Sequence, residues 1–480
     1  MTGSKELKRP MLTMKSNKIN NFNENLPNDA TTDALKEEIQ KSSDLTTDYE
    51  STDDSDKSTS ASLNNFTDQH KEFITKCKEE LVNSSLPVDF DQWTLQEQYD
   101  HLINNINKYF PNIPESLRFV LPAIFKDGDC GRPANERPDW LDMDKFYRGQ
   151  QFALRYLTGV ALSGLMSLLM IFNFADGLKP LILSQKSNTP YRAFKRYLST
   201  NRRFMNWYIS DPWREGTQAY RDIQMVRKLH RNMREKLCKI SDDQIDRESE
   251  ITQLMCPAFK TIARDFEETC PTGKSWQCPY TMLRMKGLNQ GDMAGTQFAL
   301  MGLIVLYPEQ FGVHNASEED LEAFCHLWRG LGYLLGIEDQ YNFCRGSLQD
   351  VRRRAEDFIE YWVKPNFPTV TAKWEHMSIC VFEGIGFIAL FKSYKAFLLY
   401  LCNVLKLDMP GLYKSLSWSE TIMYWALKCL FFLLKFPDVS RIMNAIFHKD
   451  LNRATEFGTE KLATLEKKSS KIIQEFVVAL

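Results

Sequence analysis

The sequence predicts an all-α protein. After about residue 70, apolar residues recur at the helical spacing i, i+3, i+4 and i+7, and no stretch shows sustained alternation of apolar and polar residues. No internal repeat is visible, which argues against a solenoid or a propeller. Because 43% of the 480 residues are hydrophobic, the chain can bury a large core. We therefore expect a single large helical domain.

The N-terminal segment differs from the rest in composition. Residues 1–65 are rich in Ser, Thr, Asn, Asp and Lys and carry few aromatic residues, so we predict a disordered tail. The first residues have no apolar stretch of the kind found in a signal peptide. Eleven cysteines without a Cys-x-x-Cys pair are typical of reduced thiols. We expect an intracellular protein without a zinc finger, a c-type haem or a disulfide scaffold.

The first predicted helices follow the tail. Residues 93–109 have the pattern of an amphipathic helix, and a proline-rich stretch then breaks the chain. Residues 137–144 resemble the start of a helix, with acidic residues in the first turn.

An uncharged run of 19 residues, Leu157–Ala175, comes next. Its length would span a bilayer. It also contains Gly159, Ser163, Gly164 and Ser167, and small residues suit close packing against helices or a flat cofactor. A buried helix is favoured, and a membrane span remains open.

The most informative region contains two further predicted helices. In residues 225–237 a histidine, His230, is centred on the apolar face formed by Val226, Leu229, Met233 and Leu237. A buried imidazole needs a partner, which is either a backbone carbonyl or a metal such as a haem iron. The first alternative is the more frequent in proteins. A second histidine, His326, lies in a Leu- and Trp-rich helix and is interpreted as a packing residue.

A line of polar residues, Arg196, Thr200 and Arg203, lies beside the apolar face of the helix predicted over 191–209. It is either an ordinary solvated stripe or a place where an anion or a polarised oxygen is held. From Lys186 to Lys236 there are 13 Lys and Arg against 4 Asp and Glu. This excess needs an anionic partner, a solvated face or acidic neighbours from elsewhere in the fold. The whole-chain net charge of −2 gives no case for nucleic acid as a partner.

Two apolar C-terminal segments, Ile379–Leu405 and Tyr424–Leu434, are interrupted by charges. They are more typical of interfacial or core helices than of membrane spans. If the protein attaches to a membrane, we expect these segments to do so, with Lys392, Lys395, Lys428 and Lys435 reaching anionic headgroups. A chain ending near residue 372 should then be soluble and keep its cofactor.

Four stretches of the sequence are similar to motifs of one known family and occur in the same order as in that family. They are Trp140–Gln150, Arg196-x-x-x-Thr200, Val226-Arg-x-x-His230-x-x-x-Arg234 and Phe324–Ile337. With these motifs and the interval from Arg196 to His230, the chain resembles the latex-clearing protein (rubber oxygenase) and endoplasmic-reticulum-bound oxygenase family, over roughly residues 115–370. The family is all-helical and binds haem b.

The resemblance implies specific roles. His230 would be the proximal iron ligand, and Arg196 and Thr200 would line the haem pocket and serve catalysis. The reaction would be the oxidative cleavage of an apolar, isoprenoid-like substrate by dioxygen, which makes the protein an oxidoreductase. The haem domain would cover residues 66–372, and residues 373–480 would form a C-terminal helical region with the membrane surface, including that of the endoplasmic reticulum, as a candidate partner.

Two departures from the family bear on catalysis. Ser199 stands where a rubber oxygenase can have a distal lysine, and Lys195 is poorly placed to replace it. The family's upstream glutamate has no counterpart, and Asp176 is the nearest carboxylate. Three hypotheses therefore remain: a haem oxygenase, a haem-binding sensor or carrier without turnover, and a cofactor-free helical protein of the membrane surface.

Overall fold

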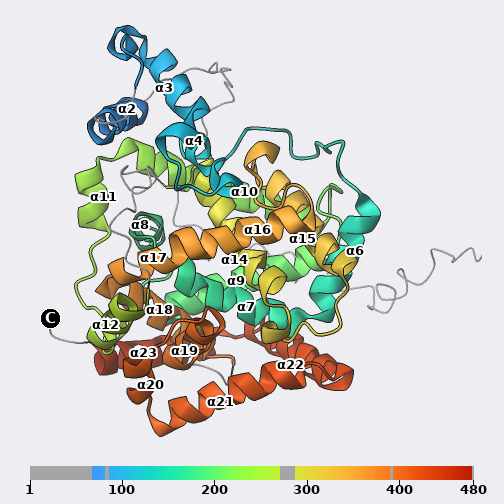
Figure 1. The fold of residues 1–480 in the computed structure, drawn as a ribbon. Helices are drawn as coiled ribbons and strands as arrows, with labels where there is room; N and C mark the ends of the chain where they lie inside the picture. The colour runs from blue at the N-terminus through green and yellow to red at the C-terminus, as the bar shows by residue number, and fades with distance from the viewer. Residues whose placement is uncertain (1–67, 82–85, 271–286, 390–392, 478–480) are drawn as a thin grey trace, which may run out of the picture. The chain divides into compact units, whose positions relative to one another are not determined.

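The computed structural model describes residues 68–81, 86–270, 287–389 and 393–477 (Figure 1). In these ranges the protein consists of α-helices with short 3₁₀ and π segments, and they contain two isolated β-bridges but no strand. The predicted all-α class is confirmed. Residues 66–480 form one compact unit. The tail predicted to be disordered, residues 1–65, lies outside the described residues.

The helices of the N-terminal and central parts include those that carry the predicted site. They are α2 (Asp68–Glu80), α3 (Leu95–Asn104), α4 (Ile106–Tyr109), α5 (Val120–Ala123), α6 (Met143–Arg155), α7 (Leu157–Ile171), α8 (Ala175–Leu183), α9 (Pro190–Ile209), α10 (Gln218–Lys239), α11 (Asp242–Glu248) and α12 (Phe259–Thr269).

The remaining helices complete the unit. They are α14 (Gln290–Leu306), α15 (Glu318–Leu334), α16 (Leu348–Phe358), α17 (Lys364–Asn366), α18 (Ala372–Ile385), α19 (Tyr394–Val404), α20 (Pro410–Lys414), α21 (Trp418–Leu433), α22 (Pro437–Thr455) and α23 (Thr459–Phe476). A π-helical segment, Ile359–Val363, joins α16 to α17, and 3₁₀ turns lie at Phe90–Gln92, Glu115–Leu117, Glu309–Phe311, Asp339–Tyr341 and Phe367–Thr369.

Three helix pairs are closely packed within the unit: α6 with α15, α9 with α18, and α7 with α14. In two of these pairs, a glycine allows the backbones of the two helices to lie close together. A Cβ atom at Gly149 of α6 would lie 2.3 Å from the carbonyl oxygen of Ala323 on α15. A Cβ atom at Gly384 of α18 would lie 2.6 Å from the carbonyl oxygen of Pro190 on α9. A larger residue at either position would push the helices apart.

Helix α7 is the uncharged run of the sequence, and it is a core helix. Ten of its side chains are buried, and it packs on α14. Gly159 lies against the carbonyl oxygen of Phe311, as a small residue at a close contact should. Among the described helices, none is by itself long and apolar enough to cross a membrane; the pair α6 and α7, bent by 86°, passes the same test of length and composition.

The C-terminal helices divide into a buried and a surface group. The first segment expected to reach a membrane, Ile379–Leu405, is mostly core: Ile379 and Phe397 are 0% exposed, and Lys395 is paired with Glu420. That part of the expectation is wrong, because most side chains of α18 and α19 are buried in the core; Lys392 lies outside the described residues. Since α18 packs along α9, which carries Arg196, a cut near residue 372 would also remove part of the core beside the predicted site.

Candidate functional site

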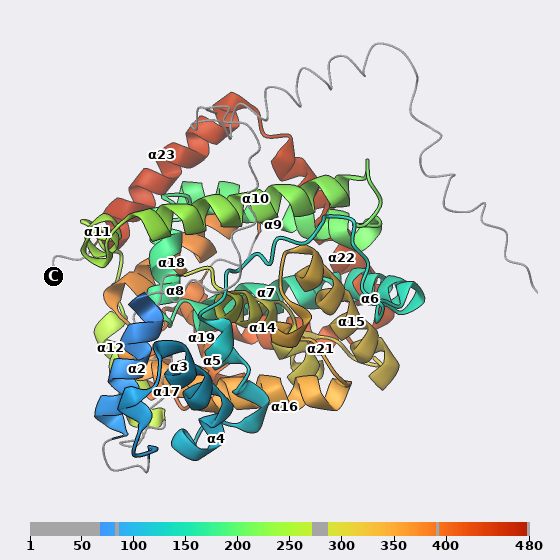
Figure 2. The ribbon, with the colours of Figure 1, turned by 90° about the horizontal axis from the view of Figure 1, so that it is seen from above.

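The predicted site residues lie on two neighbouring helices, α9 and α10 (Figure 2). Each helix begins at a threonine whose hydroxyl accepts a backbone hydrogen bond: Thr189 from Arg192, and Thr217 from Tyr220. Pro190, at the first position of α9, suits the helix start because it has no N–H to satisfy. The side chains of Asn206 and Asp222 are hydrogen bonded at 2.7 Å and tie α9 to α10.

His230 lies on α10 as a half-buried residue, but its Nδ1 atom is fully covered and has no hydrogen-bond partner in the described part of the chain. Burial lowers the pKa of His230 to about 4, and the nearby Arg196 guanidinium adds to this effect, while Asp129 opposes it. The imidazole is therefore neutral at physiological pH, with a lone pair on one ring nitrogen.

Arg196 lies close enough to His230 to affect its pKa, so the structure brings these two predicted residues together. The Nη1 atom of Arg196 donates to the hydroxyl of Ser187 at 3.0 Å and more weakly to that of Ser184 at 3.4 Å. No ion pair to a carboxylate is found for Arg196 in the described ranges. Within these ranges, the half-buried guanidinium group of Arg196 therefore has serine hydroxyl groups as its hydrogen-bond partners.

Thr200 is half-buried on the same helix, and its hydroxyl donates to the carbonyl oxygen of Arg196 at 3.0 Å. This is an ordinary bond of a helical threonine to the preceding turn. The structure therefore places Thr200 one turn from Arg196 and shows its hydroxyl engaged with its own helix, without a contact to His230.

The third residue of the polar line is not solvated. Arg203 is half-buried, its Nη1 atom donates to Ser199 at 2.8 Å, and its Nε atom is covered with no partner among the residues described. Burial lowers the pKa of this guanidinium. The indole N–H of Trp207 and the side-chain amide nitrogen of Gln224 are covered and without a described partner as well. Sequence reasoning missed this group of donors, because single Trp and Gln residues carry no spacing motif.

The cationic face of α10 has its counterions within the fold. Asp129, from the loop before α6, is 8% exposed and pairs with both Arg227 and Arg231. Arg227 also donates to the carbonyl oxygen of Arg132 at 3.0 Å, and Arg234 pairs with Asp127. Of the three explanations for the basic segment, acidic neighbours from elsewhere in the fold account for these arginines. The same contacts fix α10, and with it His230, to the loop.

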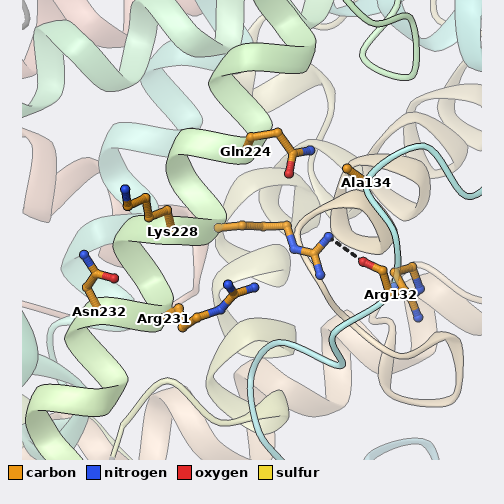
Figure 3. A pocket seen from close by; sticks show the side chains of 7 residues that line it. Arg132, Ala134, Gln224, Lys228, Arg231 and Asn232 are labelled. Atoms are coloured by element: carbon orange, nitrogen blue, oxygen red, sulfur yellow. Dashed lines mark hydrogen bonds between the residues drawn. The ribbon is translucent and has the colours of Figure 1, made fainter. Parts of the chain in front are cut away.

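A pocket of about 370 Å³ lies between this loop and α10 (Figure 3). It does not include His230. Its lining residues are Arg132, Ala134, Gln224, Arg227, Lys228, Arg231 and Asn232. Figure 3 shows Gln224, Lys228, Arg231 and Asn232 along one side of α10, with Arg132 and Ala134 opposite. Arg227, three residues before His230 on α10, therefore lines a pocket that His230 does not line.

Two other buried histidines have structural partners. The Nε2 atom of His326 accepts the backbone N–H of Asp142 at 3.1 Å, at the start of α6, which confirms its interpretation as a packing residue. His376 on α18 accepts the N–H of Met255 at 3.1 Å, and its Nε2 atom lies 3.1 Å from the carbonyl oxygen of Asn188. The described residues contain no cluster of three or more His, Cys, Asp or Glu suited to a free metal ion.

The positions where the sequence departs from the family are engaged elsewhere. Ser199 accepts its bond from Arg203, and the exposed Lys195 lies over the ring of Tyr191. Asp176 is half-exposed and pairs with Lys179 at 2.7 Å. None of these three side chains shows a contact to His230 or Arg196.

Comparison with known proteins gives a single family. Residues 153–374 match the model of the ER-bound oxygenase mpaB/B'/rubber oxygenase catalytic domain. No curated protein and no solved structure matches the chain. The matched segment begins in α6 and ends in α18, and it contains α9 and α10 with Arg196, Thr200 and His230. The resemblance drawn from the sequence motifs is confirmed by this match over residues 153–374.

Proposed function

We propose that the protein is a haem b-dependent oxygenase that acts with dioxygen on an apolar, isoprenoid-like substrate, with His230 as the iron ligand and Arg196 and Thr200 in the haem pocket. The observation that carries the proposal is the covered, unpartnered Nδ1 atom of His230 in the described structure. A buried polar group without a partner costs about 1–3 kcal/mol, so a bound group that engages the imidazole would remove this cost.

The chemistry of His230 fits a haem. Haem iron takes a neutral imidazole as its protein ligand and needs only one, so the lack of a larger cluster of ligands around His230 is no obstacle. The low pKa of His230 keeps the imidazole neutral. No hydrogen bond from a described residue holds the Nδ1 atom of His230.

Arg196 supports the same assignment. The arginines of α10 at positions 227, 231 and 234 are paired with aspartates, whereas the hydrogen-bond partners of the Arg196 guanidinium among the described residues are serine hydroxyls. A guanidinium in this state suits the carboxylate of a haem propionate, which it can hold by charge-assisted hydrogen bonds. Thr200, one turn further along α9, would border the same space.

Helix α7 offers an apolar surface of the kind a flat cofactor needs. Although most of its side chains are buried, Ala161, Gly164, Leu168 and Ile171 remain partly exposed at i, i+3, i+7 and i+10. A Cβ atom at Gly164 would meet no described atom within 4 Å. When bound, haem b supplies an iron that activates dioxygen for the cleavage of a carbon–carbon double bond. In this proposal the protein supplies the iron ligand (His230), the cation (Arg196) and the apolar surface of α7.

A second candidate is a haem-binding sensor or carrier. It is favoured by the hydrogen bond of Ser199 with Arg203 and the ion pair of Asp176 with Lys179, because neither position then offers a free base or acid for turnover. Oxygen uptake by the haem-loaded protein with an isoprenoid substrate separates the two candidates. For the cellular site we follow the ER-bound description of the family and propose an intracellular protein at the endoplasmic reticulum membrane.

The experiment that tests the proposal is a haemin titration of the purified full-length protein, followed by absorption spectroscopy. We expect a Soret band that saturates at one haem per chain. A featureless spectrum would contradict the haem assignment and leave the third hypothesis, a cofactor-free protein of the membrane surface. The same titration of His230→Ala shows whether any bound haem depends on the proposed ligand.

A further inference from the structure

Helix α21 and the turn after it present an apolar surface to solvent. The exposed large side chains are Trp418, Ile422, Trp425, Phe432, Leu433 and Phe436, with exposed fractions of 87%, 66%, 51%, 57%, 42% and 47%. Cys429 and Ser419 are exposed on the same face. Trp418, Ile422, Trp425, Cys429 and Phe432 are spaced three or four apart and so follow one side of the helix, and Leu433 and Phe436 continue the apolar surface at its C-terminal end. We call these six large side chains the α21 face.

The α21 face is the main concentration of exposed apolar residues in the described chain. Elsewhere such residues are scattered, as at Val88, Leu95 and Ile209, and single exposed apolar residues are normal on soluble proteins. The opposite side of α21 carries Tyr424, Leu427 and Phe431, which are buried against α19 and the turn at Glu309–Phe311. The helix is therefore anchored by its inner side, and its outer side is apolar without being part of the core. Such a surface is typical of an interaction site.

Charges border the face without entering it. Lys428 lies 5.1 Å from the ring centre of Trp425, and Lys435 lies 3.7 Å from that of Phe432. Neither lysine is paired with a carboxylate in the described structure, in contrast to Lys395, which pairs with Glu420. The pairing of exposed tryptophans with flanking lysines is the composition of a membrane interface, where the aromatic rings lie at the headgroup level and the ammonium groups reach anionic headgroups.

We propose that the α21 face docks the protein on the surface of a bilayer that contains anionic lipids. From Trp418 to Leu433 the helix is about 22 Å long, so it would lie along the surface with its rings among the headgroups. Helix α22 adds the exposed Ile442 and Ile446, and Figure 1 shows α21 and α22 on the same side of the unit. This proposal rests on the surface alone and stands whether or not the protein binds haem.

A second copy of this chain is the main competing occupant. Protein interfaces are depleted of lysine, and a pair of identical faces would place the unpaired ammonium groups of Lys428 and Lys435 from both copies at one interface. Anionic headgroups complement these two ammonium groups, and the second copy does not. The charge pattern thus favours lipid.

The test is cosedimentation of the full-length protein with vesicles of phosphatidylcholine alone or with phosphatidylserine. We expect binding that needs phosphatidylserine and weakens as salt is added, because part of the attraction is electrostatic. The triple variant Ile422→Asp, Trp425→Asp and Phe432→Asp should bind on the order of a hundredfold more weakly. The control Val88→Asp with Leu95→Asp, which changes exposed apolar residues outside the face, should bind like the wild type.

A second variant tests the charges without touching the apolar side chains. Lys428→Glu with Lys435→Glu should abolish the dependence on phosphatidylserine. Circular dichroism and thermal unfolding check that each variant is folded. The proposal is overturned if the wild type stays in the supernatant with both vesicle types, or if the triple variant binds as well as the wild type. A concentration-dependent dimer that the triple variant abolishes, without vesicle binding by the wild type, would assign the face to a second copy.

Discussion

The Nε atom of Arg227 donates a hydrogen bond of 3.1 Å to Asp129, and Arg227 lies three residues before His230 on α10. Both charged side chains are buried, at 6% and 8% exposure. The loop that precedes α6 therefore holds the helix that carries the proposed iron ligand. Because a buried charge is costly without its partner, this contact links the stability of the protein to the position of His230.

Asp129→Asn tests this link. The substitution leaves the buried Arg227 without a charged partner, so we expect the free energy of unfolding to fall by about 3–5 kcal/mol. Urea unfolding followed by circular dichroism measures the loss. Asp139→Asn is the control, since Asp139 is an exposed aspartate in the same loop and should leave stability nearly unchanged. Equal stability of the two variants would show that the pair does not hold α10.

The ligand assignment predicts that His230→Ala removes stoichiometric haem binding. His448→Ala, which changes an exposed histidine on α22, should leave the Soret band unchanged. His326→Ala should lower thermal stability, because His326 accepts the N–H of Asp142 at the start of α6, but it should still bind haem when folded. An unchanged spectrum in His230→Ala would falsify the assignment.

Arg196 is predicted to hold the anionic edge of the haem. Arg196→Ala should weaken haem retention by about 1.5–3 kcal/mol, the range for a hydrogen bond to a charged group, or roughly 10- to 150-fold. The matched control is Arg202→Ala, since Arg202 is exposed on the same helix; Arg203 is unsuitable because it is half-buried. Haem transfer to apomyoglobin measures retention. Similar transfer rates for both variants would mean that Arg196 does not hold the haem and has a structural role.

Sequence periodicity predicts much of this fold for a physical reason. The apolar stripes of α9 and α15 are local, so these helices and their inward faces can be derived without knowing their neighbours. For α10 the prediction is only partly right, because Leu229, placed on the inward face by its spacing, is 41% exposed. The pairing of Asp129 with Arg227 joins residues 98 positions apart, and no local pattern encodes it.

The sequence-based errors have the same origin. For the line that contains Arg203 the sequence left a solvated stripe and an anion site open, and only the fold shows that the Nε atom of Arg203 is covered. Segment Ile379–Leu405 and segment Tyr424–Leu434 are similarly apolar, yet only tertiary packing decides that Phe397 is buried and Trp425 exposed.

The packing of α18 on α9 gives a prediction about truncation. A chain ending at residue 372 would lose α18, and with it Phe382 and the other buried residues of its inner side, which belong to the same core as Trp207 of α9. We therefore expect this fragment to be insoluble or unfolded, contrary to the expectation from the sequence of a soluble fragment that keeps its cofactor. Expression followed by size-exclusion chromatography decides the point. A monodisperse fragment that binds haemin would show that residues 373–480 are dispensable for the fold.

A buried carboxyl group makes stability depend on pH. Glu375 on α18 is 0% exposed, accepts hydrogen bonds from the N–H of Ala258 and the hydroxyl of Tyr394, and has a covered Oε2 atom without a described partner. Burial raises the pKa of Glu375 to about 7, although these hydrogen bonds and Lys395 oppose the shift. The folded state therefore binds a proton more tightly than the unfolded state, and stability falls as the pH rises from about 4.5 to 7.

Glu375→Gln keeps an oxygen for the two hydrogen bonds and removes the charge. We expect the variant to be more stable than the wild type at pH 8, by on the order of 2–3 kcal/mol, and similar to it near pH 4.5. His326 and His376, whose pKa values are lowered to about 4 by burial, give the opposite slope below pH 6.5 in both proteins, so the difference between variant and wild type isolates Glu375. Urea unfolding across this pH range measures it, with the exposed Glu268→Gln on α12 as the control. A difference that does not change with pH would mean that the pKa of Glu375 is the same in the folded and the unfolded protein.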